Sequence, residues 1–214
     1  MKLKKTIQQW KQYSKMSDLG EIARRKFFNN CFDGALTCAG IVSGIFIIFL
    51  TGSSIFIPRS VIITGFATAL AIGISGLWGA FLSEEAERKK KMLDMKKEMA
   101  IIEEEGDEKT DKSKKHKKRN KPLLERAEGF ATIVASLVDG GAPVLGSSLP
   151  LIPFFFGRSL TLAHFIFSYC ILICLLVYLG IFLGKISGGG RFRYAVHLVT
   201  AGGVTLIVSL ALGI

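Results

Sequence analysis

Five long apolar stretches, separated by short polar turns and one long charged loop, dominate the chain. They cover about residues 27–51, 60–82, 127–156, 161–184 and 194–213. Each approaches or exceeds the roughly 20 residues that a helix needs to cross the hydrocarbon layer of a membrane. Their apolar residues do not alternate strictly with polar ones, as barrel strands would require. The pattern therefore predicts an all-α membrane protein with five transmembrane helices.

Four regions follow from this pattern: an amphipathic segment (1–26), the first two spans (27–82), a charged loop (83–122) and the last three spans (123–214). In the first region, apolar residues recur every three positions among Lys and Gln, which predicts a helix lying on an anionic membrane surface. A disordered basic tail is the alternative. In the loop, residues 84–105 contain good helix formers of alternating charge and predict a helical insert. Residues 106–121 are of low complexity and predict a disordered linker.

The basic residues lie mostly on one side of the predicted spans. The chain has 28 Lys and Arg against 17 Asp and Glu, and the turns after the first and third spans contain only Arg59 and Arg158. The positive-inside rule predicts that the N-terminus and the insert are cytoplasmic and the C-terminus is outside, in the cell membrane if the source is prokaryotic. This segregation argues against nucleic-acid binding. The polar first 26 residues argue against a cleavable signal peptide.

Two carboxylates, Asp33 and Asp139, lie inside predicted spans. An ionised group at the centre of a span costs roughly 2.5–3.5 kcal/mol, which makes it a functional candidate. Asp139 is expected about 15 Å into its span, near the midplane, and directly before residues 140–143 (GGAP), where proline should break the helix. Free carbonyls beside a carboxylate suit a hard cation; a structural hydrogen bond is the alternative. Asp33 is expected about 9 Å beyond Lys26 and shares a helix face with Thr37; a shallow helix-capping carboxylate is the alternative.

The second span carries hydroxyl groups on one helix face. Thr68 and Ser75 follow Thr64 by four and eleven residues, which places all three on the same side of a helix. They predict a polar lining for a transport pathway. Small residues among them fit close helix packing equally well.

The loop helix offers candidate metal ligands on one face. These are Glu84, Glu87, Met95 and Glu98. Carboxylates combined with thioethers suit a borderline transition metal better than magnesium. Because lysines lie among them, a solvated charged helix is the alternative.

The remaining reactive side chains carry weaker signals. Four cysteines, Cys31, Cys38, Cys170 and Cys174, all lie in spans without disulfide or zinc spacing and are expected to fill the core. His164 and His197 are expected to be packed and neutral, with proton relay as the alternative. The residues around the two aspartates, Phe-Asp-Gly and Val-Asp-Gly, do not match those of intramembrane aspartyl proteases, so no enzyme activity is expected.

Four stretches resemble the vacuolar iron transporter family of Fe²⁺/Mn²⁺ transporters. These are FDGALTCAG (32–40), SGLWGAFLS (75–83), LPLIPFF (149–155) and the fifth span with its preceding turn (188–213). The resemblance implies a dimer of five-helix protomers, with the first-span aspartate at Asp33 and a cytoplasmic insert that gathers metal on glutamates and methionines. It also implies exchange of metal for protons. In the second span, Gly76 and Ala80 stand where the family has Met and Glu, which removes a thioether and a carboxylate that favour Fe²⁺.

Together these features predict a homodimeric transporter that moves divalent cations out of the cytoplasm in exchange for protons. Asp33, Thr37, Asp139, Thr68 and Ser75 would line the pathway, and metal would bind at both aspartates and at the loop-helix ligands. Fe²⁺ or Mn²⁺ is expected as substrate, with no tightly bound cofactor, and anionic lipids are expected partners. The alternatives are a transporter of another solute with the same fold, and a membrane scaffold that binds anionic lipid without transport.

Overall fold

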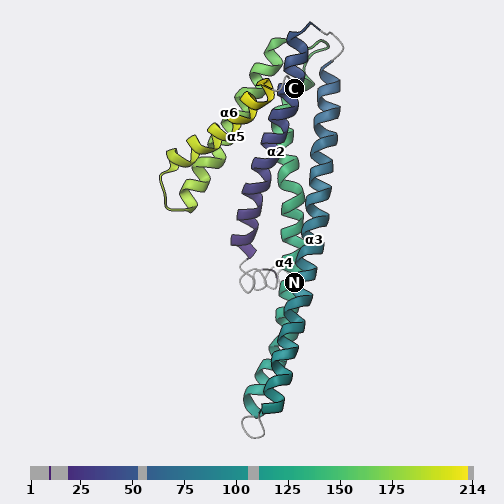
Figure 1. Cartoon of the computed structure of the whole chain (residues 1–214), viewed down its shortest axis with the longest axis vertical. Coiled ribbons are helices and arrows are strands. Elements are labelled where there is room, and N and C mark those ends of the chain that lie inside the picture. Colours follow the sequence, from purple (N-terminus) through teal and green to yellow (C-terminus); the bar gives the residue numbers. More distant parts are fainter. Residues whose placement is uncertain (1–9, 11–18, 53–56, 106–110, 212–214) are drawn as a thin grey trace, which may run out of the picture. The chain divides into compact units, whose positions relative to one another are not determined.

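The computed structural model describes Trp10 and residues 19–52, 57–105 and 111–211. For residues 96, 98–105, 111–125 and 210 it describes the backbone alone. The described chain is all-helical, without strands (Figure 1). Its elements are α2 (Leu19–Leu50), α3 (Pro58–Glu105), α4 (Asp111–Ser148), the 3₁₀-helix η1 (Leu149–Phe155), α5 (Leu162–Ile186) and α6 (Arg191–Ala211). Five of the described helical segments are long and apolar enough to cross a membrane. The predicted five-span helical architecture is confirmed.

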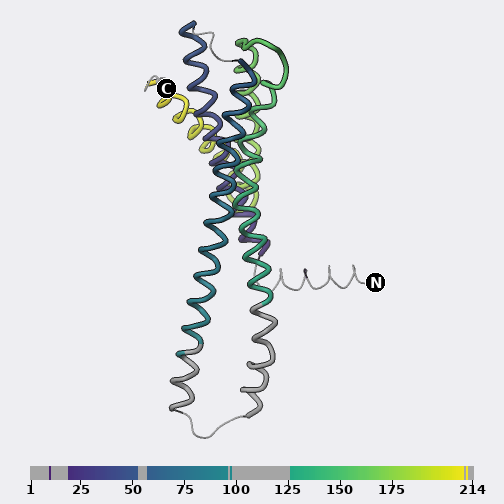
Figure 2. The backbone as a smooth tube through the Cα atoms, turned by 90° about the vertical axis from the view of Figure 1, so that its right-hand side faces the viewer, coloured from purple at the N-terminus to yellow at the C-terminus, as the bar shows by residue number. Residues whose placement is uncertain are grey.

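The chain forms two compact units. Unit 1 comprises residues 1–24 and 76–138, and unit 2 comprises residues 25–75 and 139–214. Within unit 1, residues 76–95 of α3 run beside residues 126–138 of α4, as Figures 1 and 2 both show. Unit 2 contains most of α2, the first part of α3, the last part of α4, and η1, α5 and α6.

The helical insert predicted over residues 84–105 is present as the end of α3. The disordered linker predicted over 106–121 is wrong for residues 111–121, which form the start of α4. Lysine has good helix propensity and offsets the weaker formers in this segment. Residues 106–110, and most of the predicted amphipathic segment 1–26, lie outside the described residues. Within that segment Trp10 is helical and stacks on Phe130 with ring centroids 5.8 Å apart.

The core of unit 2 is built from small residues and aromatic rings. One cluster joins Val42, Val61, Leu151, Phe154 and Phe165, each at most 1% exposed. A second and a third cluster pack α2 against α5 through alanines, cysteines and leucines. Cys31 and Cys38 are buried members of these clusters, as expected for cysteines that fill a core. The same expectation is wrong for Cys170 and Cys174, which are exposed on α5.

At the crossing of α2 and α4 the two backbones touch directly. A Cβ atom on Gly34 would collide with the carbonyl oxygen of Pro143, and one on Gly146 would collide with that of Cys31. The Ser147 Oγ lies 2.9 Å from Gly34 O and 2.8 Å from Pro143 O, and its single proton is shared between these two acceptors. Small residues permit such close approach between membrane helices, where packing replaces the hydrophobic effect.

The helix break predicted at residues 140–143 is wrong. α4 continues through Pro143 to Ser148 and tightens into η1 only where Pro150 and Pro153 follow. Pro143 removes one backbone donor, and the packing of its turn against α2 and α3 outweighs that loss. In η1, the Ser168 hydroxyl donates to Pro150 O at 2.7 Å. It supplies the donor that Pro153 lacks in the 3₁₀ pattern.

Replacing Gly34 by alanine tests the α2–α4 crossing. The added methyl meets backbone atoms that cannot rotate away, so Gly34→Ala is expected to destabilise the protein by about 1–3 kcal/mol. Gly40→Ala is the matched control on the same helix, because a Cβ there meets nothing within 4 Å. Reversible unfolding in mixed micelles measures both. Equal stability of the two variants would contradict the close crossing.

Candidate functional site

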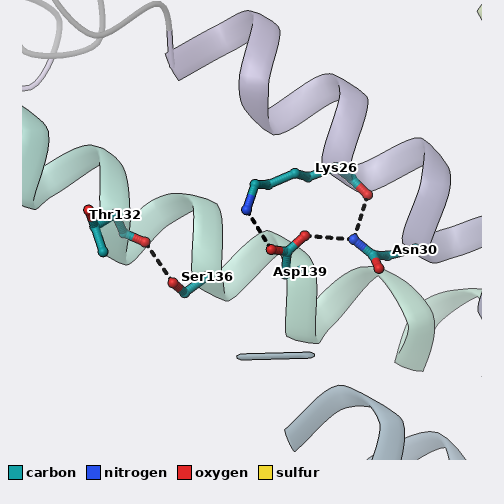
Figure 3. Close-up of polar contacts among 5 residues, drawn as sticks. All are labelled: Lys26, Asn30, Thr132, Ser136 and Asp139. Atoms are coloured by element: carbon teal, nitrogen blue, oxygen red, sulfur yellow. Dashed lines mark hydrogen bonds and ion pairs between the residues drawn. The ribbon is translucent and has the colours of Figure 1, made fainter. Parts of the chain in front are cut away.

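Asp139 is held by two side chains of α2 (Figure 3). Its Oδ2 lies 2.6 Å from Lys26 Nζ, and its Oδ1 accepts a hydrogen bond from Asn30 Nδ2 at 2.6 Å. Asn30 Nδ2 also donates to the carbonyl oxygen of Lys26 at 2.9 Å. The Lys26 and Asp139 side chains are only 20% and 14% exposed. Both oxygens of this carboxylate therefore already have donors.

The ion pair bears on the expected depth of Asp139. Lys26 is the cation that flanks the first span. Because its ammonium group contacts Asp139, this carboxylate lies no further from the polar end of the first span than a lysine side chain reaches. Asp33, seven residues further along α2, lies about 10 Å deeper. The contact with Lys26 favours a shallower position, whereas Asp139 lies near the middle of the candidate span Arg126–Phe155, so the midplane position stays a prediction.

Asp33 has a different environment. It is exposed on the surface of α2, and Thr37 donates its hydroxyl to the backbone carbonyl of Asp33 at 2.9 Å. No contact among the described residues joins Asp33 to Asp139. The two predicted aspartates thus belong to separate sites. Both carboxylate oxygens of Asp139 have hydrogen-bond donors, whereas the Asp33 side chain is exposed.

The hydroxyl face of the second span is only partly available. Thr68 donates its hydroxyl to Thr64 O of its own helix at 2.9 Å, while Ser75 is exposed. Gly73, between them, packs against Gly140 and Val144 of α4. Helix packing therefore accounts for the small residues of this stretch, and the polar pathway remains a prediction.

Unit 1 contains a pocket of about 180 Å³ at the polar ends of α3 and α4. Three glutamates, Glu84, Glu87 and Glu128, contribute to its wall. The other lining residues are Ile22, Arg88, Lys91, Ala131, Thr132 and Ala135. Two of the predicted loop-helix ligands are thus joined by Glu128, which the sequence reasoning missed. Its one signal was its position just before the apolar part of the third span.

The pocket combines negative and positive groups. Lys91 Nζ lies 3.4 Å from Glu87 Oε1, and the Arg88 guanidinium lies against Gly129 of α4. Met95 is exposed and does not line the pocket, while the Glu98 side chain lies outside the described part. Among the described residues, no group of three His, Cys, Asp or Glu side chains is arranged to hold a metal ion. The full loop-helix ligand set therefore stays a prediction.

His164 has a structural role at the start of α5. Its Nδ1 accepts from the Thr161 backbone N–H at 3.2 Å and lies 2.7 Å from the Thr161 hydroxyl. Its Nε2 contacts the carbonyl oxygen of Phe156, which requires the Nε2–H tautomer. The ring is 9% exposed and stacks on Phe154. This is the packed neutral histidine that was expected; His197, by contrast, is exposed.

These features define an integral, multi-pass helical membrane protein with a polar helical extension. No family model matches the chain. It is 32% identical over 169 residues to the uncharacterized protein MJ0645 of Methanocaldococcus jannaschii, covering 78% of this chain and 76% of that protein. The chain belongs to the same family as that archaeal protein.

A double-mutant cycle on Lys26 and Asp139 tests their coupling. Lys26→Met leaves a largely buried carboxylate without its cation, which costs more than removing both charges. The cycle with Asp139→Asn is expected to give a coupling energy of about 1–3 kcal/mol in unfolding measurements. The exposed pair Lys91→Met with Glu87→Gln is the control and should give at most about 0.5 kcal/mol. Additive effects at Lys26 and Asp139 would mean that the two charges do not interact.

Proposed function

We propose that the protein is a membrane transporter that moves divalent metal cations out of the cytoplasm. The observation that carries this proposal is that Glu84, Glu87 and Glu128 line one pocket from two helices, although they are not arranged there as a ready-made ligand set. Carboxylates are ligands for divalent cations, and a pocket at the polar end of the spans is well situated to collect a cation before it crosses.

The basic side chains of the pocket wall, Arg88 and Lys91, could help to release a bound metal ion. Lys91 Nζ lies 3.4 Å from Glu87 Oε1, so this carboxylate already has a nearby positive charge. A divalent ion competes with this lysine through its higher charge. Carboxylates that give up a metal can take up protons instead, which supports exchange of metal for protons.

Along the spans, Asp33 with Thr37 is the better-supported step. An exposed carboxylate in a span is costly beside lipid, which supports a homodimer whose second copy covers this face of α2. At Asp139 an arriving cation would have to replace the ammonium group of Lys26. The resemblance of Asp33 and its surroundings to the vacuolar iron transporters supports this scheme. Gly76 and Ala80 argue for a broader choice among Fe²⁺, Mn²⁺ and similar ions.

A second function is favoured by one observation. Because Lys26 neutralises Asp139, the spans can contain this carboxylate without moving any ion. This ion pair therefore favours a non-transporting scaffold as the second candidate function. A same-fold transporter of another solute is the remaining alternative. The transport measurement below separates these from the main proposal.

The transport proposal is tested with sealed proteoliposomes and a fluorescent metal indicator. Wild type should carry Mn²⁺, Fe²⁺ or Co²⁺. Asp33→Asn should lower the maximal rate at least about tenfold, because one lost charge-compensating interaction at a buried ion costs more than about 1.4 kcal/mol. Asp139→Asn is run beside it to separate the two aspartates.

The pocket is tested in the same assay. Glu84→Gln, Glu87→Gln and Glu128→Gln combined should raise the metal concentration for half-maximal transport, with little change in maximal rate. Glu85→Gln is the matched control, since Glu85 pairs with Lys89 and does not line the pocket. Wild-type vesicles that carry none of the three metals would refute metal transport. Transport unchanged in the triple variant would refute only the role of the pocket.

The proposed orientation has the N-terminus and the insert in the cytoplasm and the C-terminus outside, as the distribution of Lys and Arg supports. A reporter at the C-terminus should therefore be active as alkaline phosphatase and dark as green fluorescent protein. The same reporters at the N-terminus are the control and should give the reverse pattern. Fluorescence at the C-terminus would invert the proposed direction of transport.

A further inference from the structure

The turn between α5 and α6 carries positive charge without a nearby counter-charge. Lys185, Arg191 and Arg193 are all exposed there. No acidic residue follows Asp139 in the chain. The ion pairs that join described residues do not include these three cations. Unit 2 as a whole has seven Lys and Arg but only two acidic side chains, and one of these is taken by Lys26.

The turn is held firmly by close packing of the two helices. The backbone of Arg191 lies so near Gly184 that a Cβ there would be 2.6 Å from the Arg191 Cα. Tyr194 lies over Gly189, whose added Cβ would be 2.9 Å from the ring. Gly188 turns the chain with a φ of 67°, which favours glycine. The cations therefore extend from a fixed framework, so that little ordering is needed for binding.

An aromatic ring stands between the two arginines. Phe192 is 81% exposed, whereas Tyr194, two residues on, packs inward against the turn. The turn lies at the end of two spans, as Figure 1 shows for α5 and α6, and so at a membrane boundary. Cations beside an exposed aromatic ring at that depth are typical of segments that bind phosphate groups and insert among lipid headgroups.

We propose that the α5–α6 turn, residues 185–193, is a docking surface for anionic phospholipid headgroups. Lys185, Arg191 and Arg193 bind the lipid phosphates, and Phe192 inserts at the boundary between headgroups and acyl chains. The charge of the surface selects the lipid, because each cation near an anionic membrane strengthens binding roughly five-fold. The surface is separate from the proposed metal pocket and does not depend on transport.

Hydrogen exchange of the turn tests the proposal in the full-length protein. The protein is placed in nanodiscs of phosphatidylcholine alone or with about one lipid in four replaced by phosphatidylglycerol, and peptides covering 186–193 are followed by mass spectrometry. Phosphatidylglycerol should slow exchange in wild type. Arg191→Gln with Arg193→Gln should abolish most of this slowing at the same lipid composition, because two five-fold losses lower the affinity for the anionic lipid about 25-fold.

The matched control is Arg59→Gln with Arg158→Gln, which removes two exposed arginines at the other end of the spans and should leave the slowing intact. Arg191→Lys with Arg193→Lys keeps the charge and should also retain it. If the glutamine variant does not reconstitute, Lys185→Gln alone should still reduce the slowing, because it lowers the affinity for the anionic lipid about five-fold. The proposal is overturned if the turn exchanges equally fast in both lipids. It is also overturned if inorganic phosphate in phosphatidylcholine discs slows exchange as much as phosphatidylglycerol does.

Discussion

Where α2 crosses α4, main-chain atoms of the two helices meet with no side chain between them. This contact fixes one register: Lys26 meets Asp139 and Gly34 meets Ser147, each pair 113 residues apart. The helices run parallel, so a carboxylate one turn before Pro143 arrives beside a cation two turns before Gly34. The close contact at Gly34 thus brings the two charges together. Without Lys26, the largely buried Asp139 carboxylate would be strongly destabilising in unit 2.

The same water-poor environment explains the other polar contacts of unit 2. Proline removes backbone donors, and within a membrane no water replaces them. Ser168 supplies a donor to η1, and Ser147 bonds to both helices of the crossing. Ser168 thus replaces the donor that Pro153 lacks, while Ser147 ties the backbones of the two crossing helices together.

The carboxylates of the protein differ in how easily their partners can be exchanged. Asp139 is nearly buried and has donors on both oxygens. Glu87 pairs with Lys91 at a longer distance, with both side chains more than 60% exposed. A cation from solution therefore meets less competition in unit 1 than in the spans, which is the physical basis for assigning metal capture to the pocket. The uncompensated cations of the α5–α6 turn suit an anionic partner instead, such as a phospholipid headgroup.

The sequence by itself determined the five spans, because about 20 consecutive apolar residues have few other stable arrangements. It also located the helical insert and the core role of Cys31 and Cys38, whereas the exposure of Cys170 and Cys174 appeared only in the structure. Only the tertiary structure decided the environment of Asp139, since its partners lie more than a hundred residues away. Local rules likewise placed a break at Pro143 that packing against α2 removes, and they overlooked Glu128, which joins Glu84 and Glu87 only when α3 and α4 lie side by side. Helix formation depends on neighbours a few residues away and can be read locally, whereas ion pairs and pockets depend on which helix faces meet.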